Sequence, residues 1–116
     1  MIHKMKLANK PFEMIKSGEK TIELRLYDEK RQQLKIGDEI EFVNLATLEK
    51  MVCGISNIYV FRSFDELYKS LPLLKCGYTK DDIQNADPKD MDAYYSEEEQ
   101  KLYGAVGIEL SGRNIL

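Results

Sequence analysis

The chain has 116 residues, of which 43% are hydrophobic and 32% are charged. This balance is typical of one folded, soluble domain spanning residues 1–116, and it excludes a disordered tail. The net charge of −3 argues against a protein that coats duplex nucleic acid by charge alone. No run of about 18 apolar residues is present and the N-terminal stretch lacks the apolar core of a signal peptide, so we expect no membrane association and a cytoplasmic location.

Charge is distributed unevenly along the sequence. Residues 1–35 hold nine Lys or Arg against five acids, whereas residues 81–100 hold eight acids against one lysine. This asymmetry favours a small anionic ligand or a short single strand, bound by the N-terminal third, over a long duplex. Cys53, Cys76 and the single histidine, His3, form no zinc pattern. We therefore expect no metal and no cofactor, and we predict that both thiols are reduced packing residues.

The N-terminal segment predicts a strand, a short helix and a second strand. Residues 3–8 alternate weakly, as in an edge strand. Asn9 is placed to cap the following helix, Pro11 falls in its first turn, and Gly18 is placed to end it in the left-handed conformation. Residues 21–27 then alternate cleanly between an apolar and a polar face: Ile22, Leu24 and Leu26 against Thr21, Glu23, Arg25 and Tyr27.

The middle of the sequence predicts a polar loop and two more strands. The loop over residues 28–35 leads to a turn at Ile36-Gly37-Asp38. Residues 39–45 predict one strand, and residues 51–61 predict a longer one in which Gly54 is a candidate bulge or bend.

The C-terminal part predicts helices and a closing strand. Ser63 and Glu66 form a candidate capping box, and Thr79 repeats that pattern more weakly. Residues 90–103 read as helical, divided into two short helices if Ser96 starts the second, and residues 105–110 read as the last strand. This order predicts an α+β fold, a small mixed β-barrel with helices packed on its outside. Such a barrel would leave no exposed edge strands and a cleft where the first helix leaves the sheet.

Lys20, Glu23 and Arg25 are the candidate functional residues of the second strand. Glu23 and Arg25 project from the same face, and Lys20 lies at the turn before the strand, so the three side chains can converge. An arginine can hold a phosphate or carboxylate by two bonds, and a lysine can act as a base or nucleophile. Spacing alone favours the ordinary alternative, in which Glu23 and Arg25 form ion pairs on a solvated strand face.

The segment Gly18-Glu19-Lys20-Thr21-Ile22-Glu23-Leu24-Arg25 resembles the GxKxxExR signature of ASCH domains, small relatives of the PUA RNA-binding barrel. The sequences Lys35-Ile36-Gly37-Asp38, Glu39-Ile40-Glu41-Phe42 and Tyr103-Gly104-Ala105-Val106-Gly107-Ile108-Glu109 fit the same family order. The resemblance implies a PUA-like barrel that binds RNA or a nucleotide-like ligand in a cleft lined by Lys20, Glu23 and Arg25.

The resemblance also raises an enzymatic alternative. Bacterial acetylcytidine amidohydrolases use the signature lysine, a threonine three positions later and a glutamate from a later helix, and some ASCH proteins are described as ribonucleases. In this sequence Lys20 matches, Glu23 stands at the threonine position, and the later glutamate would be one of residues 97–99. In a hydrolase, Lys20 would be the base or nucleophile and Glu23 the proton carrier.

Residues outside the signature are further candidates for contact with the same ligand. Asp28, Lys30 and Arg31 follow the signature strand and could extend the cleft toward phosphates, or could form a solvated loop. Tyr94 and Tyr95 could stack on a base, although packing of one and partial exposure of the other is the ordinary arrangement. A protein-interaction module built on the acidic C-terminal helices is a third function class, and the sequence leaves the oligomeric state open.

Overall fold

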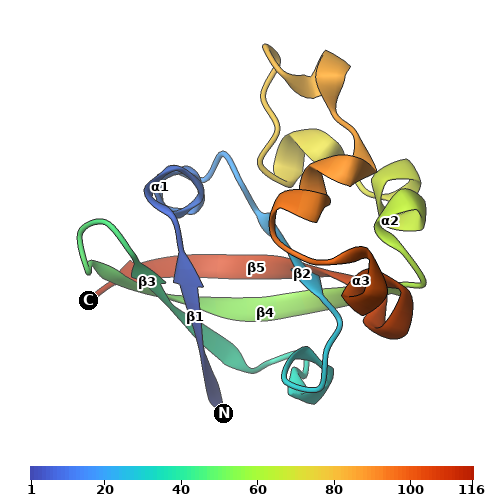
Figure 1. Ribbon diagram of the computed structural model, residues 1–116. Helices are drawn as coiled ribbons and strands as arrows, with labels where there is room; N and C mark the ends of the chain where they lie inside the picture. The colour runs from blue at the N-terminus through green and yellow to red at the C-terminus, as the bar shows by residue number, and fades with distance from the viewer.

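The computed structural model describes residues 1–116 as a five-stranded mixed sheet with helices on its outside (Figure 1). Four short 3-10 helices interrupt the loops, at Arg31–Gln33, Leu73–Lys75, Ile83–Asn85 and Pro88–Ala93. The remaining elements, in chain order, are β1 (Ile2–Leu7), α1 (Asn9–Ser17), β2 (Ile22–Leu26), β3 (Glu39–Asn44), β4 (Lys50–Phe61), α2 (Phe64–Ser70), α3 (Glu97–Tyr103) and β5 (Ala105–Ile115).

The sheet is a half-barrel whose two end strands are β1 and β2. The strand order is β1-β3-β4-β5-β2, in which β1 runs parallel to β3 and every other pair is antiparallel. The predicted class, an α+β mixed barrel with external helices, is confirmed. The expectation that closure would remove both edges is wrong, because no backbone ladder joins β1 to β2.

Helix α1 ends as predicted but begins differently. Gly18 adopts the left-handed conformation with φ 89° and donates its N–H to the carbonyl of Ile15. The predicted cap at Asn9 is wrong: the helix is capped by Ala8 without a side-chain bond. The Asn9 side chain instead accepts a hydrogen bond from the buried Asn44 at 3.0 Å, and this tertiary partner outweighs local capping.

Two other local predictions match the structure, and a third matches in part. The β4–β5 register shifts between Val52 and Gly54, which confirms the bulge. Ser96 and Glu99 form a complete capping box at the start of α3. Ser63 accepts from the Glu66 N–H, but the Glu66 carboxylate bonds the Arg62 N–H rather than closing the predicted box.

The core consists of two apolar clusters, and β2 contributes to the second. The first lies under α1 and contains Met5, Leu7, Phe12, Ile15, Leu34, Ile40, Phe42, Met51, Cys53, Ile55, Val106 and Ile108. The second joins the apolar face of β2 to α2 and the later loops and contains Ile22, Leu24, Leu26, Phe64, Leu67, Cys76, Met91 and Ala105. Both cysteines are free and buried. Burial of these side chains supplies most of the drive for folding.

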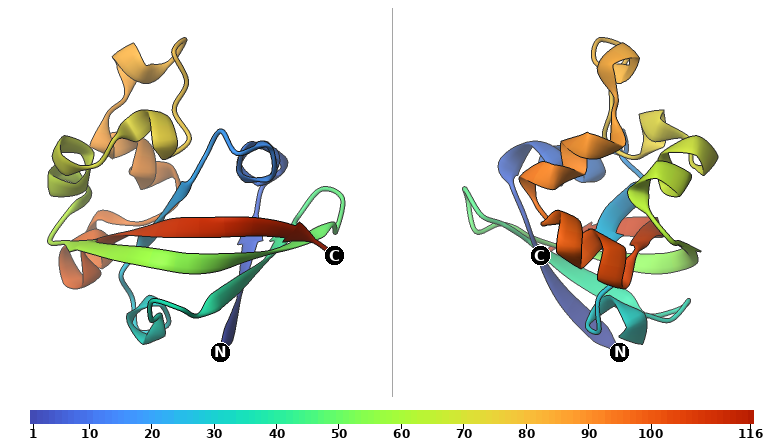
Figure 2. Two further views of the ribbon diagram at one scale, coloured as in Figure 1. Left: turned by 180° about the vertical axis from the view of Figure 1, so that it is seen from behind. Right: turned by 45° about the vertical axis from the view of Figure 1, so that its right-hand side comes forward.

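Helix α1 and the segment 71–95 stand on the same side of the long strands β4 and β5 (Figures 1 and 2). The link from α1 into β2 runs between them. This arrangement leaves the polar face of β2 facing the space between the helix and the segment.

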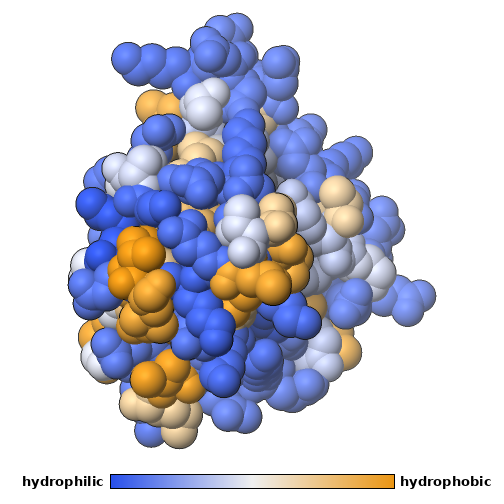
Figure 3. Space-filling view, turned by 90° about the vertical axis from the view of Figure 1, so that its left-hand side faces the viewer, coloured by the Kyte–Doolittle hydropathy of each residue, from blue (hydrophilic) through white to orange (hydrophobic).

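The outer surface of the α1 side is mostly hydrophilic, with apolar side chains in separate small patches (Figure 3). Scattered apolar exposure of this kind is normal for folded proteins. None of the helices combines the length and the apolar character needed to span a bilayer.

Candidate functional site

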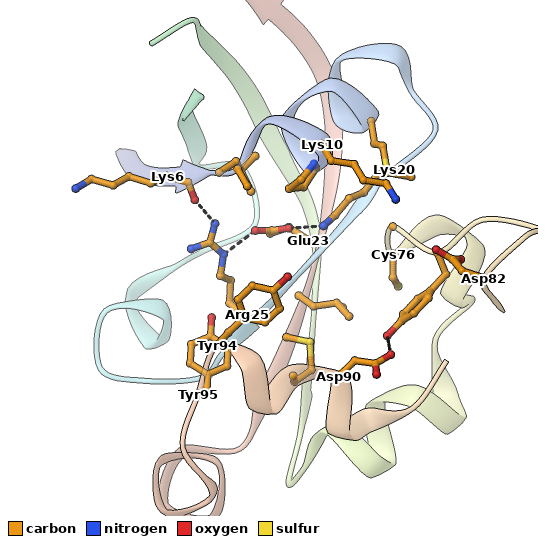
Figure 4. Close-up of a pocket in the computed structure, with 18 of the residues that line it drawn as sticks. Lys6, Lys10, Lys20, Glu23, Arg25, Cys76, Asp82, Asp90, Tyr94 and Tyr95 are labelled. Carbon is orange, nitrogen blue, oxygen red and sulfur yellow. Dashed lines mark hydrogen bonds and ion pairs between the residues drawn. The ribbon is translucent and has the colours of Figure 1, made fainter. Parts of the chain in front are cut away.

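A cavity of about 530 Å³ lies between the start of α1, the polar face of β2 and the segment 76–95 (Figure 4). Its volume falls within the range that holds small-molecule and cofactor ligands in proteins. The signature residues Lys20, Glu23 and Arg25 all line it. It is therefore the place where the structure brings the predicted residues together.

Backbone hydrogen bonds at the end of α1 position Lys20. After the turn at Gly18, the Lys20 N–H donates to the carbonyl of Met14 at 3.0 Å, and the Thr21 N–H donates to the carbonyl of Lys75 at 2.9 Å. Gly77, at φ 113°, passes close to the Lys20 side chain, where an added Cβ would lie 3.4 Å from Cδ. Lys20 is only 8% exposed, so its ammonium is held at the cavity wall rather than in bulk solvent.

Glu23 forms the centre of a buried ion cluster. Its Oε1 lies 2.7 Å from the Lys20 Nζ, and its Oε2 accepts a hydrogen bond from the Arg25 Nε at 2.6 Å. Burial alone would raise the pKa of Glu23, but the attraction and hydrogen bonds of Lys20 and Arg25 outweigh it and hold that pKa at about 2. Glu23 is thus ionised at neutral pH, and the three groups together carry one net positive charge.

Arg25 links this cluster to the far end of the sheet. Burial lowers the pKa of Arg25, but Glu23 more than compensates and the net pKa is raised, so the guanidinium is permanently charged. One of its terminal nitrogens donates to the Lys6 carbonyl of β1 at 2.8 Å. Because β1 and β2 have no backbone ladder between them, this bond joins the two ends of the sheet.

A hydrogen-bonded chain of side chains forms the opposite wall. Tyr78 donates to the Asp90 carboxylate at 2.7 Å, and the Tyr68 and Tyr78 hydroxyls lie 2.7 Å apart. Because the single hydroxyl proton of Tyr78 is donated to Asp90, Tyr68 is the donor to Tyr78. Burial, together with the bond that Tyr78 donates to Asp90, raises the pKa of Tyr78 well above its usual range, so it stays a neutral donor.

The two candidate stacking residues differ in their surroundings, although both line the cavity. Tyr95 lies parallel to Phe64 with ring centroids 6.1 Å apart. Tyr94 is 74% exposed. One tyrosine is therefore packed and the other is available at the cavity rim, as the ordinary arrangement predicted (Figure 4).

The predicted extension through Asp28, Lys30 and Arg31 lies outside the cavity. Asp28 pairs with Arg31 at 3.1 Å, and Lys30 is exposed. In their place, the structure brings residues to the cavity that sequence reasoning did not select: Lys6, Lys10, Tyr68, Cys76, Tyr78, Asp82 and Asp90. The excess of basic residues in the N-terminal third included Lys6 and Lys10, but no local pattern marked the other five.

Burial raises the pKa of the Cys76 thiol to about 11, and nearby Lys20 offsets this only in part. Cys76 is therefore a neutral thiol in the cavity wall and not a nucleophile at neutral pH. No group of three His, Cys, Asp or Glu side chains is placed to hold a metal ion.

The family model of the ASCH domain matches residues 5–112 of the sequence. The chain belongs to the ASCH domain family. ASCH domains have a PUA-like fold of the kind that binds RNA, and the family is generally associated with nucleic acid. The match confirms the family that the signature strand indicated, and it extends over nearly the whole chain.

Solved structures similar to this ASCH domain cover almost all of it. The crystal structure of the hypothetical protein PH0355 is 35% identical, with a TM-score of 0.77, and the match covers 96% of this chain and 98% of that one. The solution structure of protein PF0455 from Pyrococcus furiosus is 34% identical, with a TM-score of 0.71, and the match covers 96% of both chains.

A more distant structure shares the fold alone. The crystal structure of a serine-to-alanine mutant of ZmASCH from Zymomonas mobilis is 12% identical to this ASCH domain, with a TM-score of 0.70. The match covers 98% of this chain and 70% of that protein. The sequence matches none of the curated proteins with which it was compared.

Proposed function

We propose that this ASCH domain binds RNA or a nucleotide-like ligand in the cavity lined by Lys20, Glu23 and Arg25. The observation that carries the proposal is the buried cluster, which places one net positive charge in a cavity of about 530 Å³ on a protein of net charge −3. Local positive charge on an otherwise acidic protein favours a phosphate-bearing ligand at this one place.

Other lining residues support the same ligand class. Lys10 adds an exposed ammonium group on the side of the cluster, whereas Lys6 contributes its backbone carbonyl and turns its ammonium away from the cavity (Figure 4). Tyr94 offers an exposed ring at the rim, on which a base can stack. We assign Asp28, Lys30 and Arg31 to contacts with a longer RNA strand only, because they lie outside the cavity.

The geometry does not favour the hydrolase alternative. Glu23, with a pKa of about 2 and both oxygens bonded to cations, is a poor proton carrier at neutral pH. None of Glu97, Glu98 and Glu99 lines the cavity. The set of lysine, threonine and later glutamate is therefore not assembled here.

Titration calorimetry with nucleoside monophosphates and a short single-stranded RNA tests the proposal. We expect Lys10→Ala to weaken mononucleotide binding by about fivefold, since one lost charge–phosphate contact costs on the order of 1 kcal/mol. The Lys10 side chain is exposed, so folding is preserved.

Lys30→Ala is the matched control, because it removes an exposed lysine outside the cavity. We expect mononucleotide binding to stay within about twofold of the unmodified protein, as for a surface charge with no contact. Unchanged affinity in Lys10→Ala, or no binding of any RNA or nucleotide, would overturn the proposal.

A further inference from the structure

One wall of the cavity has hydrogen-bond donors without a partner, and the other wall has acceptors without a partner (Figure 4). On the wall formed by α1 and β2, the ammonium group of Lys10 has no acceptor in the protein, and the Lys20 ammonium uses only its bond to Glu23. This wall therefore offers donors.

Asp82 offers a free acceptor on the opposite wall. Its Oδ1 accepts the Thr79 N–H at 2.6 Å, a bond that fixes the turn. No donor in the protein bonds its Oδ2. The carboxylate is thus held in place by its own loop and retains one free oxygen.

Asp90 likewise has one bonded and one free carboxylate oxygen. Its Oδ2 accepts from the Tyr78 hydroxyl at 2.7 Å and from the Asp87 N–H at 3.2 Å, which fix the side chain. Its Oδ1 has no donor in the protein. The wall formed by the segment 76–95 therefore presents two positioned carboxylates, each with one unused oxygen.

A ligand that fits between these walls must present an anion to one and hydrogen-bond donors to the other. A carbonyl oxygen turned toward Asp82 or Asp90 would meet a like partial charge and leave the carboxylate unpaired, which is costly. An amino group turned toward either carboxylate would pair with its free oxygen. Sites with positioned polar groups reject analogues that lack the matching group more strongly than apolar pockets do.

We infer that the cavity orients a nucleotide with its phosphate toward Lys10 and Lys20 and with an exocyclic amino group of its base toward the wall that carries Asp82 and Asp90. This inference rests on the proposed function and adds a ligand class to it. Nucleotides of cytosine and adenine, which carry an exocyclic amino group, should bind more tightly than nucleotides of uracil and hypoxanthine, which carry a carbonyl at the same position.

Matched nucleotide pairs test this orientation. We expect cytidine monophosphate to bind at least about fivefold tighter than uridine monophosphate, and adenosine monophosphate tighter than inosine monophosphate by a similar factor, as for loss of one exposed charge-assisted bond. Cytidine without its phosphate should bind more weakly, and Lys10→Gln should reduce the advantage that the phosphate provides.

Asp82→Asn is the decisive variant, and Asp81→Asn, at an exposed neighbour outside the cavity, is its control. The asparagine oxygen can still accept from Thr79, so the loop is retained, and matching thermal unfolding curves verify this. We expect the cytosine preference to fall by at least half its value in Asp82→Asn and to persist in Asp81→Asn.

Equal affinities within each pair, or a preference unaffected by Asp82→Asn, would overturn the inference while leaving the proposed function standing. Failure of every nucleotide and of single-stranded RNA to bind would instead overturn the proposed function, and the inference with it.

Discussion

At the scale of single residues, Glu23 is the buried acid on which the ion cluster depends. It is 3% exposed and holds two cations through its two oxygens. Removing the charge from such a cluster leaves Lys20 and Arg25 buried without their counter-ion. We expect Glu23→Gln to lower the free energy of unfolding at pH 7 by about 3 kcal/mol, and Glu13→Gln, at an exposed site, by less than about 0.5 kcal/mol.

The same residue makes stability depend on pH in the acid range. Its pKa is about 2 in the folded state against 4.5 as the ordinary value. Since the folded pKa is the lower one, Glu23 contributes stability above about pH 4.5 and loses that contribution as the pH falls toward 2. Urea unfolding at pH 7 and pH 3 should show the gap between the unmodified protein and Glu23→Gln shrinking at pH 3. A gap of constant size would contradict this.

At the scale of elements, the loop after the 3-10 helix Leu73–Lys75 forms part of the wall around Lys20. Gly77 has φ 113°, and a Cβ there would lie 3.4 Å from the Lys20 Cδ, whereas Gly37 has φ 96° and open space around it. Alanine at either position has the same backbone strain, which costs about 1 kcal/mol or more. We expect Gly77→Ala and Gly37→Ala to lower thermal stability alike.

Ligand binding should separate these two glycine variants. Only Gly77→Ala adds a methyl group in contact with the Lys20 side chain, so only it should alter nucleotide binding, by at most a few-fold, in a titration. Equal affinity in the two variants would show that the loop does not position Lys20.

At the scale of the whole molecule, the basic charge is local. At most four cations line the cavity, Lys6, Lys10, Lys20 and Arg25, and the protein as a whole is acidic. Each phosphate contact with a single strand contributes about −0.7 to the slope of log affinity against log salt. We therefore expect a short RNA to show a slope no steeper than about −3, measured by fluorescence anisotropy from 50 to 300 mM salt. A steeper slope would place binding on a broader surface.

Local sequence signals predicted the parts of the fold that short-range physics determines. Gly18, the Ser96 and Glu99 capping box and the Gly54 bulge all follow from backbone geometry or nearest-neighbour hydrogen bonds. Asn9 failed because a residue 35 positions away binds its side chain. Local patterns contain no information about such partners.

The candidate site was predicted only on one side. Alternation in the signature strand grouped Glu23 with Arg25 but could not show that the segment 76–95 covers that face. Tyr78, Asp82 and Asp90 lie in 3-10 turns and loops without a periodic pattern, so only the tertiary structure brings them to the cavity. Asp28, Lys30 and Arg31 follow the strand in sequence, but the chain turns away from the cavity there.

The bond from Arg25 to the Lys6 carbonyl connects the two free margins of the half-barrel through a side chain. A margin held by one such contact opens more readily than one held by a ladder. The same guanidinium lines the cavity, so a ligand that hydrogen-bonds to Arg25 changes how often β1 and β2 separate. Ligand binding in the cavity and local opening of the sheet between β1 and β2 are then thermodynamically coupled. Hydrogen exchange at the amides of β1 therefore responds to ligand binding, although β1 lies at the margin of the sheet.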